Sequence, residues 1–160
     1  MGAETIILKL DSERNKKLDE IISRTKEILS QVRKIKLYLL AGFYGFYLSE
    51  RRVSNGDKVD VSRGEFLEKD EYKDFQKYIA AIYELTSKND AEGSEKKSSK
   101  DMYAVFEEFV NTGVDELYNL LQNCKSSEEF LEELELRIQE AYESLGFESL
   151  EQEEIDYGNE

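Results

Sequence analysis

Apolar residues recur at helical spacing through most of this chain. In its first part, three columns of mostly apolar residues repeat every seven positions: Leu18, Thr25, Val32, Leu39 and Phe46; Ile21, Ile28, Ile35 and Gly42; and Ile22, Leu29 and Phe43. Three adjacent columns form a wide stripe, which favours packing in a globular bundle over a narrow two-stranded coiled coil. With Asp11 or Ser12 as the N-cap, the pattern predicts one long helix, straight or bent, that ends near Ser49.

Three further helices follow from the same periodicity. Ser62-x-x-Glu65 matches a capping box and predicts a helix that runs to about residue 87. Asp101 opens the next helix, and Ser126-x-x-Glu129 is a second capping box that opens the last, with Gly146 as its C-cap. The apolar stripes of these helices are, in turn, Tyr72, Phe75, Ile79 and Ile82; Met102, Phe106, Phe109, Val110, Leu117, Leu121 and Cys124; and Phe130, Leu131, Leu134, Ile138, Tyr142 and Leu145.

Two segments have patterns typical of strands. Residues 4–10, "ETIILKL", alternate between two faces, with Ile6, Leu8 and Leu10 on one of them. Residues 51–61 carry Asn55-Gly56 between flanks that contain valine, which predicts a small hairpin. The first strand then needs a partner, either this hairpin or a second chain. The alternative is that residues 4–10 extend the first helix.

Together these elements predict the fold class and the domain organisation. We expect an all-α, four-helix bundle-like domain over residues 1–147, with one long N-terminal helix, a short N-terminal strand and a small hairpin at 51–61. Residues 88–100, "KNDAEGSEKKSSK", are polar and low in complexity, which predicts a mobile linker. Residues 148–160 hold acidic side chains and no basic ones, which predicts a disordered tail.

The stretch "LYLLAGFYGFYLSE", residues 37–50, is the most apolar part of the chain. As a helix it would extend about 18 Å over its apolar part, too short for a hydrocarbon core of about 30 Å, so no membrane association is expected. A helix that is apolar on all faces is buried on all faces, which predicts Phe43 and Phe46 in the core. Gly42 and Gly45 permit either a close neighbouring backbone or a kink. For an interface with a partner, the predicted residues are Ile7, Tyr38, Tyr44 and Tyr47.

Charge divides the chain into two unlike parts. The net charge is -14, yet residues 1–63 hold 13 basic and 9 acidic side chains, whereas residues 64–160 hold 9 and 27. The acidic part is expected to repel phosphate backbones and to attract basic proteins. A single cysteine fits a reducing compartment, and the N-terminal residues do not resemble a secretory leader, so we expect a cytoplasmic protein.

The composition also excludes several kinds of chemistry. The chain has no histidine, which rules out Ser-His-Asp and Cys-His catalysis and any imidazole metal site. Walker A and Rossmann glycine patterns are missing, and no segment fits a calcium-binding loop. Glutamate pairs such as Glu107/Glu108 and Glu132/Glu133 read as solvated helix faces, and Cys124 as a small core residue. We therefore predict no catalytic residues, no cofactor and no metal.

One short segment resembles a known family. Residues 5–25, "TIILKLDSERNKKLDEIISRT", resemble the opening of ribbon-helix-helix repressors, with a strand, a turn and a helix that carries Leu18-Asp19-Glu20. The resemblance implies that strands of two chains pair and that Thr5, Ile7 and Lys9 enter the major groove of DNA. The family turns after this helix, whereas Lys26-Glu27 continue the heptad pattern here.

These observations predict a non-enzymatic protein-protein interaction or assembly protein whose acidic C-terminal half engages a basic partner. A first helix of about 40 residues would be about 60 Å long, and its surplus length favours a homo-oligomer or a partner protein. One alternative is a small helical subunit of a nucleoprotein complex, or a ribbon-helix-helix-like DNA binder. Its phosphate contacts would be Lys16, Lys17, Arg24, Lys26, Arg33 and Lys34. Another alternative is a DNA mimic that inhibits a nucleic-acid-binding protein.

Overall fold

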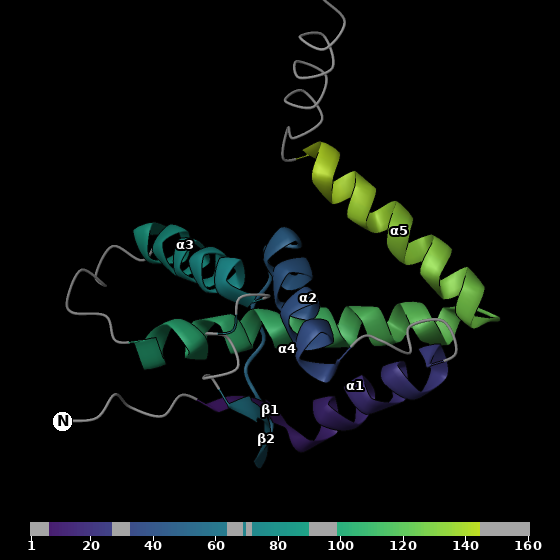
Figure 1. Cartoon of the computed structure of the whole chain (residues 1–160), viewed down its shortest axis with the longest axis horizontal. Helices are drawn as coiled ribbons and strands as arrows, with labels where there is room; N and C mark the ends of the chain where they lie inside the picture. Colours follow the sequence, from purple (N-terminus) through teal and green to yellow (C-terminus); the bar gives the residue numbers. More distant parts are fainter. Residues whose placement is uncertain (1–6, 27–32, 64–68, 70–71, 90–98, 145–160) are drawn as a thin grey trace, which may run out of the picture. The chain divides into compact units, whose positions relative to one another are not determined.

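The computed structural model describes residues 7–26, 33–63, 69, 72–89 and 99–144, and most of them are helical (Figure 1). In chain order the elements are β1 (Ile7–Asp11), α1 (Ser12–Thr25), α2 (Lys34–Tyr47), β2 (Lys58–Arg63), α3 (Lys73–Asn89), α4 (Ser99–Asn123) and α5 (Ser127–Ser144). The chain forms two compact units, residues 1–119 and 120–160, whose boundary lies inside α4. The predicted acidic tail, the C-cap Gly146 and most of the predicted linker lie outside the described residues.

The single long helix expected over residues 12–49 is wrong, because the structure has two separate helices there. α1 ends at Thr25, and the backbone of Arg33 is extended (φ -81, ψ 154) just before α2 begins. The heptad pattern did not reveal the break because each half keeps its own apolar stripe. Leu18, Ile21, Ile35 and Leu39 are all buried, as the columns predict.

The reason for the break is that α1 and α2 contact the same part of α4. Lys17 on α1 reaches Asp115, and Ala41 on α2 lies against Gly113. In one straight helix residues 17 and 41 would be about 36 Å apart. A break allows both halves to bury their apolar faces against one helix. The surplus length that favoured self-association therefore does not exist.

α2 and α4 pack backbone against backbone (Figure 1). A Cβ atom added to Gly45 would lie 2.0 Å from the carbonyl oxygen of Phe109, and one added to Gly113 would lie 1.8 Å from that of Ala41. Only glycine fits at such distances. Of the two roles predicted for Gly45, close approach to a neighbouring backbone is thus the correct one. Gly113 has the same role, and α4 continues through it without a break.

Aromatic side chains fill the space around this crossing. The ring of Phe43 lies 5.5 Å from that of Phe106 and 5.7 Å from that of Phe75 on α3, and Phe46 meets Phe109 edge to face at 5.4 Å. Phe43 and Phe46 are half-buried, whereas Tyr38 is fully buried. The prediction that this stretch lies where the chain's helices converge is confirmed. The predicted core residues Phe43 and Phe46 are only partly buried, however, and the most deeply buried ring within this stretch is that of Tyr38.

The N-terminal strand finds its partner within the chain. β1 pairs antiparallel with β2, with Ile7 opposite Arg63 and Asp11 opposite Lys58, and a bulge interrupts the register after Leu8. Leu8 and Leu10 are buried, as the alternation predicts. The predicted hairpin at 51–61 is wrong, because only its second half is a strand. The first half binds α4 instead, and the amide of Arg52 donates to the carbonyl of Glu108 at 3.1 Å.

The later helices agree with the predicted stripes except at their ends. The capping box at Ser62 is wrong, because Ser62 belongs to β2 and α3 begins at Lys73. The second capping box is confirmed: the amide of Glu129 donates to Ser126 Oγ at 3.1 Å, and Glu129 Oε2 accepts from the amide of Lys125 at 2.7 Å. Phe130 and Leu134 on α5 are buried, but Ile138 is 45% exposed and not in the core.

Candidate functional site

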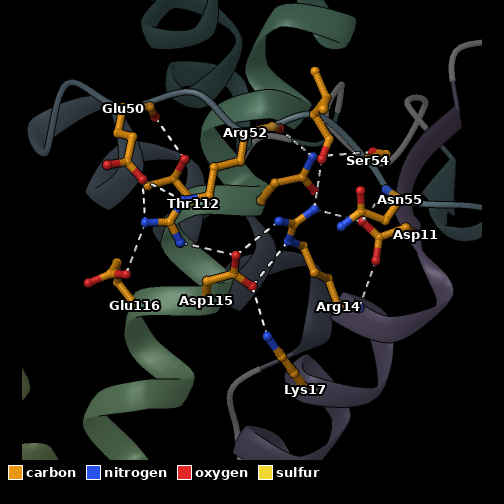
Figure 2. A network of polar contacts seen from close by, with 12 residues as sticks. Asp11, Arg14, Lys17, Glu50, Arg52, Ser54, Asn55, Thr112, Asp115 and Glu116 are labelled. Atoms are coloured by element: carbon orange, nitrogen blue, oxygen red, sulfur yellow. Dashed lines mark hydrogen bonds and ion pairs between the residues drawn. The ribbon is translucent and has the colours of Figure 1, made fainter.

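The densest group of charged side chains lies where β1, α1, the segment after α2 and α4 meet (Figure 2). We call it the Asp115 cluster and define it by Asp11, Arg14, Lys17, Arg52, Asp115 and Glu116. Its members come from opposite ends of the first unit, and Arg14 and Asp115 are 101 residues apart in sequence. None of its ion pairs was predicted.

Asp11 begins the cluster as the N-cap of α1. Its Oδ1 accepts from the backbone amide of Arg14 at 2.8 Å, which confirms one of the two predicted caps. Its Oδ2 accepts from Arg14 Nη1 at 2.8 Å and from the amide of Asn55 at 3.3 Å. Asp11 is only 1% exposed. This buried carboxylate is thus compensated by a guanidinium and two amides.

Arg14 connects Asp11 to α4. Its Nε and Nη2 donate to the two carboxylate oxygens of Asp115 at 3.1 and 2.9 Å, and Nη1 also donates to the carbonyl of Val53 at 3.0 Å. A planar guanidinium suits such a bidentate pair, which lysine cannot make. Burial by itself lowers the pKa of Arg14, but the hydrogen bonds to Asp115 and Asp11 outweigh it and raise the pKa.

Asp115 receives three cations. Besides Arg14, Lys17 Nζ lies 3.0 Å from its Oδ1 and Arg52 Nη1 lies 3.0 Å from its Oδ2. Burial by itself raises the pKa of Asp115, but hydrogen bonds from these three cations more than offset it and lower the pKa. The carboxylate is therefore ionised at neutral pH and is a weak base, poorly suited to accept a proton there.

The segment that follows α2 is held on α4 by backbone and side-chain contacts. Asn111 Nδ2 donates to the carbonyl of Arg52 at 2.8 Å, and Thr112 Oγ1 donates to the carbonyl of Glu50 at 2.8 Å. Glu107 is not on a solvated face as predicted, because it is only 8% exposed. It binds Lys58 Nζ at 2.8 Å and accepts from Ser54 Oγ at 2.8 Å. These contacts make the Asp115 cluster a structural junction.

The predicted interface residues lie mostly inside the first unit. Tyr38 is fully buried, and its hydroxyl donates to the carbonyl of Lys9 at 3.1 Å, so it offers no surface to a partner. Tyr44 is 8% exposed and stacks on the half-buried Tyr47, with ring centroids 6.3 Å apart. Ile7 is half-buried in β1. The four residues do not form one exposed patch.

Of the six predicted phosphate-binding side chains, Lys17 and Lys34 form ion pairs with described residues of the chain. Lys17 pairs with Asp115, and Lys34 Nζ lies 2.8 Å from Asp19 Oδ1 and donates to Asn15 Oδ1 at 2.6 Å. The other four are exposed: Lys16, Arg24, Lys26 and Arg33. The chain order β1, α1, α2 matches the strand, helix, helix order of ribbon-helix-helix proteins. However, β1 pairs with β2 of the same chain, which differs from that family's paired strands of two chains.

α5 presents a second kind of charged surface. It carries seven glutamates and one basic residue, Arg137. Five glutamates are exposed: Glu128, Glu132, Glu135, Glu140 and Glu143. Two large apolar side chains are exposed as well, Leu136 at 55% and Ile138 at 45%. Leu136 falls outside the predicted apolar stripe of this helix, and no role was predicted for it.

Neither surface resembles a metal centre or a membrane segment. Among the described residues, no group of three or more Cys, Asp or Glu side chains is arranged to hold a metal ion. Within the same residues, no helix is both long and apolar enough to cross a membrane. No protein-family model matches the chain, and comparisons with curated proteins and with solved structures give no significant match.

Proposed function

We propose that this chain is a non-enzymatic assembly protein whose acidic C-terminal half binds a basic surface on another protein. The observation that carries the proposal is the exposed Leu136 in the middle of the acidic face of α5. A lone exposed leucine is ordinary on a protein surface, but its surroundings here are not.

Three of the four neighbours of Leu136 on the helix surface are carboxylates, and the fourth is Gln139. Residues three and four positions apart on a helix lie side by side, so Glu132, Glu133 and Glu140 surround Leu136. Ile138, two positions further on, is also exposed, but residues two apart on a helix point to different faces, so it lies outside this acidic face. An apolar centre with a charged rim is the arrangement of many binding surfaces, in which the centre contributes most of the affinity.

The charge of this face indicates which kind of partner it can bind. Seven glutamates against one arginine repel nucleic acid and steer positively charged proteins toward α5. The leucine adds an apolar contact that a purely ionic attraction lacks. The partner that fits best therefore presents lysines or arginines around an apolar pocket or ridge.

The described carboxylates support a binding role over a catalytic one. Asp11, Asp115 and Glu107 are each held by a cation, and the chain has no histidine to act as a base near neutral pH. The exposed glutamates of α5 are spread along a helix face. Binding to a basic partner requires only the negative charge of these glutamates, whereas acid–base catalysis would require a carboxyl group with a shifted pKa.

The proposal can be tested with two synthetic peptides of equal positive charge. One is an amphipathic helix with a leucine face, and the other replaces its leucines with serine. We expect the leucine peptide to bind at least about tenfold tighter, and Leu136→Ser to remove most of that difference. Leu48→Ser is the matched control, because Leu48 is also an exposed leucine, at 37%, but lies directly after α2. Titration calorimetry at two salt concentrations measures both the apolar and the ionic contribution to the affinity.

Two outcomes would contradict this proposal. Equal affinity for both peptides, falling steeply with salt, would favour the DNA-mimic function, in which only the carboxylates matter. Binding to duplex DNA or single-stranded RNA that is lost in Lys16→Glu and Arg33→Glu variants would favour the nucleoprotein alternative. Both side chains are exposed and suit such charge reversals.

A further inference from the structure

α3 carries a second apolar stripe on its outer side. Ile79 and Ile82 face the core and are 1% and 5% exposed. Tyr78 and Leu85 are 54% and 51% exposed, and Ala81 between them is exposed as well. The spacing of three and then four residues places Tyr78, Ala81 and Leu85 in one line along the helix. One face of α3 thus packs in the core of the first unit, and the described residues of that unit leave the second face exposed.

The aromatic end of this stripe is held in a fixed position. The ring of Tyr78 packs edge-on against Phe43 at 6.1 Å and against Phe75 at 6.4 Å. Phe43 and Phe75 in turn stack at 5.7 Å. A ring that is already ordered loses little conformational entropy when it meets a partner. Tyr78 is therefore suited to be the anchor of an interface.

The charge on α3 distinguishes it from the acidic surfaces of the chain. Its described charged side chains are Lys73, Asp74, Lys77 and Glu84, which balance one another, whereas the whole chain has a net charge of -14. Two copies of such an acidic protein repel each other over most of their surfaces. Over the described part of α3, where the charges balance, this repulsion is small.

We propose that the stripe of Tyr78, Ala81 and Leu85 is the contact surface between two copies of this chain. The sequence of the stripe is complementary to itself when two α3 helices pack antiparallel around a two-fold axis. Tyr78 of one copy then lies over Leu85 of the other, and the small Ala81 lies at the axis, where the helices can approach closely. Lys77 comes within about one helical turn of Glu84 of the second copy. This surface differs from the acidic face of α5 and does not depend on the function proposed for it.

The size of the surface sets the expected affinity. One pair of helices with two large apolar side chains from each copy buries less than the roughly 1,200 Å² typical of stable complexes. The dimer is therefore weak and concentration-dependent. Because the two copies carry like charges, raising the salt concentration is expected to strengthen it.

Cysteine cross-linking tests the geometry directly. In a Cys124→Ala background, Ala81→Cys places one thiol at the proposed axis, and mild oxidation should produce a covalent dimer rapidly. Val53→Cys is the control, because Val53 is 70% exposed on a loop. Its cross-linking rate gives the rate of random collision between two copies. Equal cross-linking rates for the two cysteines would overturn the proposal.

Light scattering provides the second measurement. We expect the full chain to show a rising average mass with concentration, and Tyr78→Ser combined with Leu85→Ser to remain monomeric. Leu136→Ser should leave the mass unchanged, which separates this surface from that of α5. Circular dichroism of the double variant should show the helical content of the parent chain, because both side chains are about half exposed and the buried face of α3 is formed by Ile79 and Ile82. A parent chain that stays monomeric at several hundred micromolar in high salt would also overturn the proposal.

Discussion

The Asp115 cluster and the outer face of α5 use the same side-chain chemistry in opposite ways. Asp115 accepts from Arg14, Lys17 and Arg52 and is 14% exposed. On α5, seven glutamates share the helix with a single arginine, and five of them are exposed. The carboxylate of Asp115 is paired with cations inside the fold, whereas the exposed glutamates of α5 face solvent.

This difference shows that the number of carboxylates in a segment says little about its role. A buried carboxylate must be paired, because an uncompensated charge in the interior is costly. An exposed carboxylate contributes almost nothing to folding and is free to attract a partner. Stability should therefore depend on Asp115, and binding should depend on α5.

The largest expected effect is that of Asp115→Asn. The substitution keeps the size of the side chain but leaves Arg14, which is 7% exposed, without its bidentate partner. Breaking such a pair costs about 3–5 kcal/mol. We expect a fall in melting temperature of about 10 °C or more, measured by calorimetry. The matched control is Glu132→Gln on α5, which should change stability by less than about 0.5 kcal/mol. Equal losses of stability in the two variants would show that Asp115 is no more important for folding than an exposed glutamate of α5.

Acid should remove the contribution of Asp115 to the stability of the folded protein. The pKa of Asp115 is lowered in the folded state, below the value of about 3.9 for an unfolded aspartate. Its contribution is thus fully present above about pH 5 and is lost as the pH falls through the folded pKa. Urea midpoints of the parent chain and of Asp115→Asn should differ at pH 7, and the difference should shrink as the pH falls below about 4 toward the folded pKa. Gly45→Ala serves as an uncharged control, whose difference from the parent should not vanish in acid.

A smaller loss is expected from Gly45→Ala itself. The added Cβ would meet the carbonyl of Phe109, which is backbone and cannot rotate away. Overpacking of this kind costs about 1–3 kcal/mol, measured by urea unfolding at neutral pH. Gly56→Ala provides the comparison, because nothing lies within 4 Å of an added Cβ there, although its φ is +78. The crossing of α2 and α4 would be looser than described if Gly45→Ala cost less than Gly56→Ala.

The smallest effect on stability is expected from the α5 surface. Leu136→Ser removes an exposed side chain and should change the free energy of unfolding by no more than about 0.5 kcal/mol. The same variant should lose most of its preference for the leucine peptide described above. A large loss of stability would show that Leu136 is packed within the protein, and the contrast with the Asp115 cluster would fail.

The sequence by itself determined most of the helical stripes. Ile79, Ile82, Phe106, Val110 and Leu117 are buried as their periodicity predicts, because the spacing of apolar residues along a helix is local information. Capping signals were less reliable. Ser126 caps α5, but Ser62, with the same pattern, lies in a strand, because pairing with β1 outweighs a weak local preference.

Only the tertiary structure decided where the first helix breaks and which charges are buried. Arg33 is extended because α1 and α2 both pack on α4, a requirement that no heptad column contains. Arg14 and Asp115 form one site although 101 residues separate them, and neither residue carries a local signal of its partner. Local periodicity fixes which face of a helix is apolar, whereas long-range contacts choose the helix it meets and the charges that accompany it.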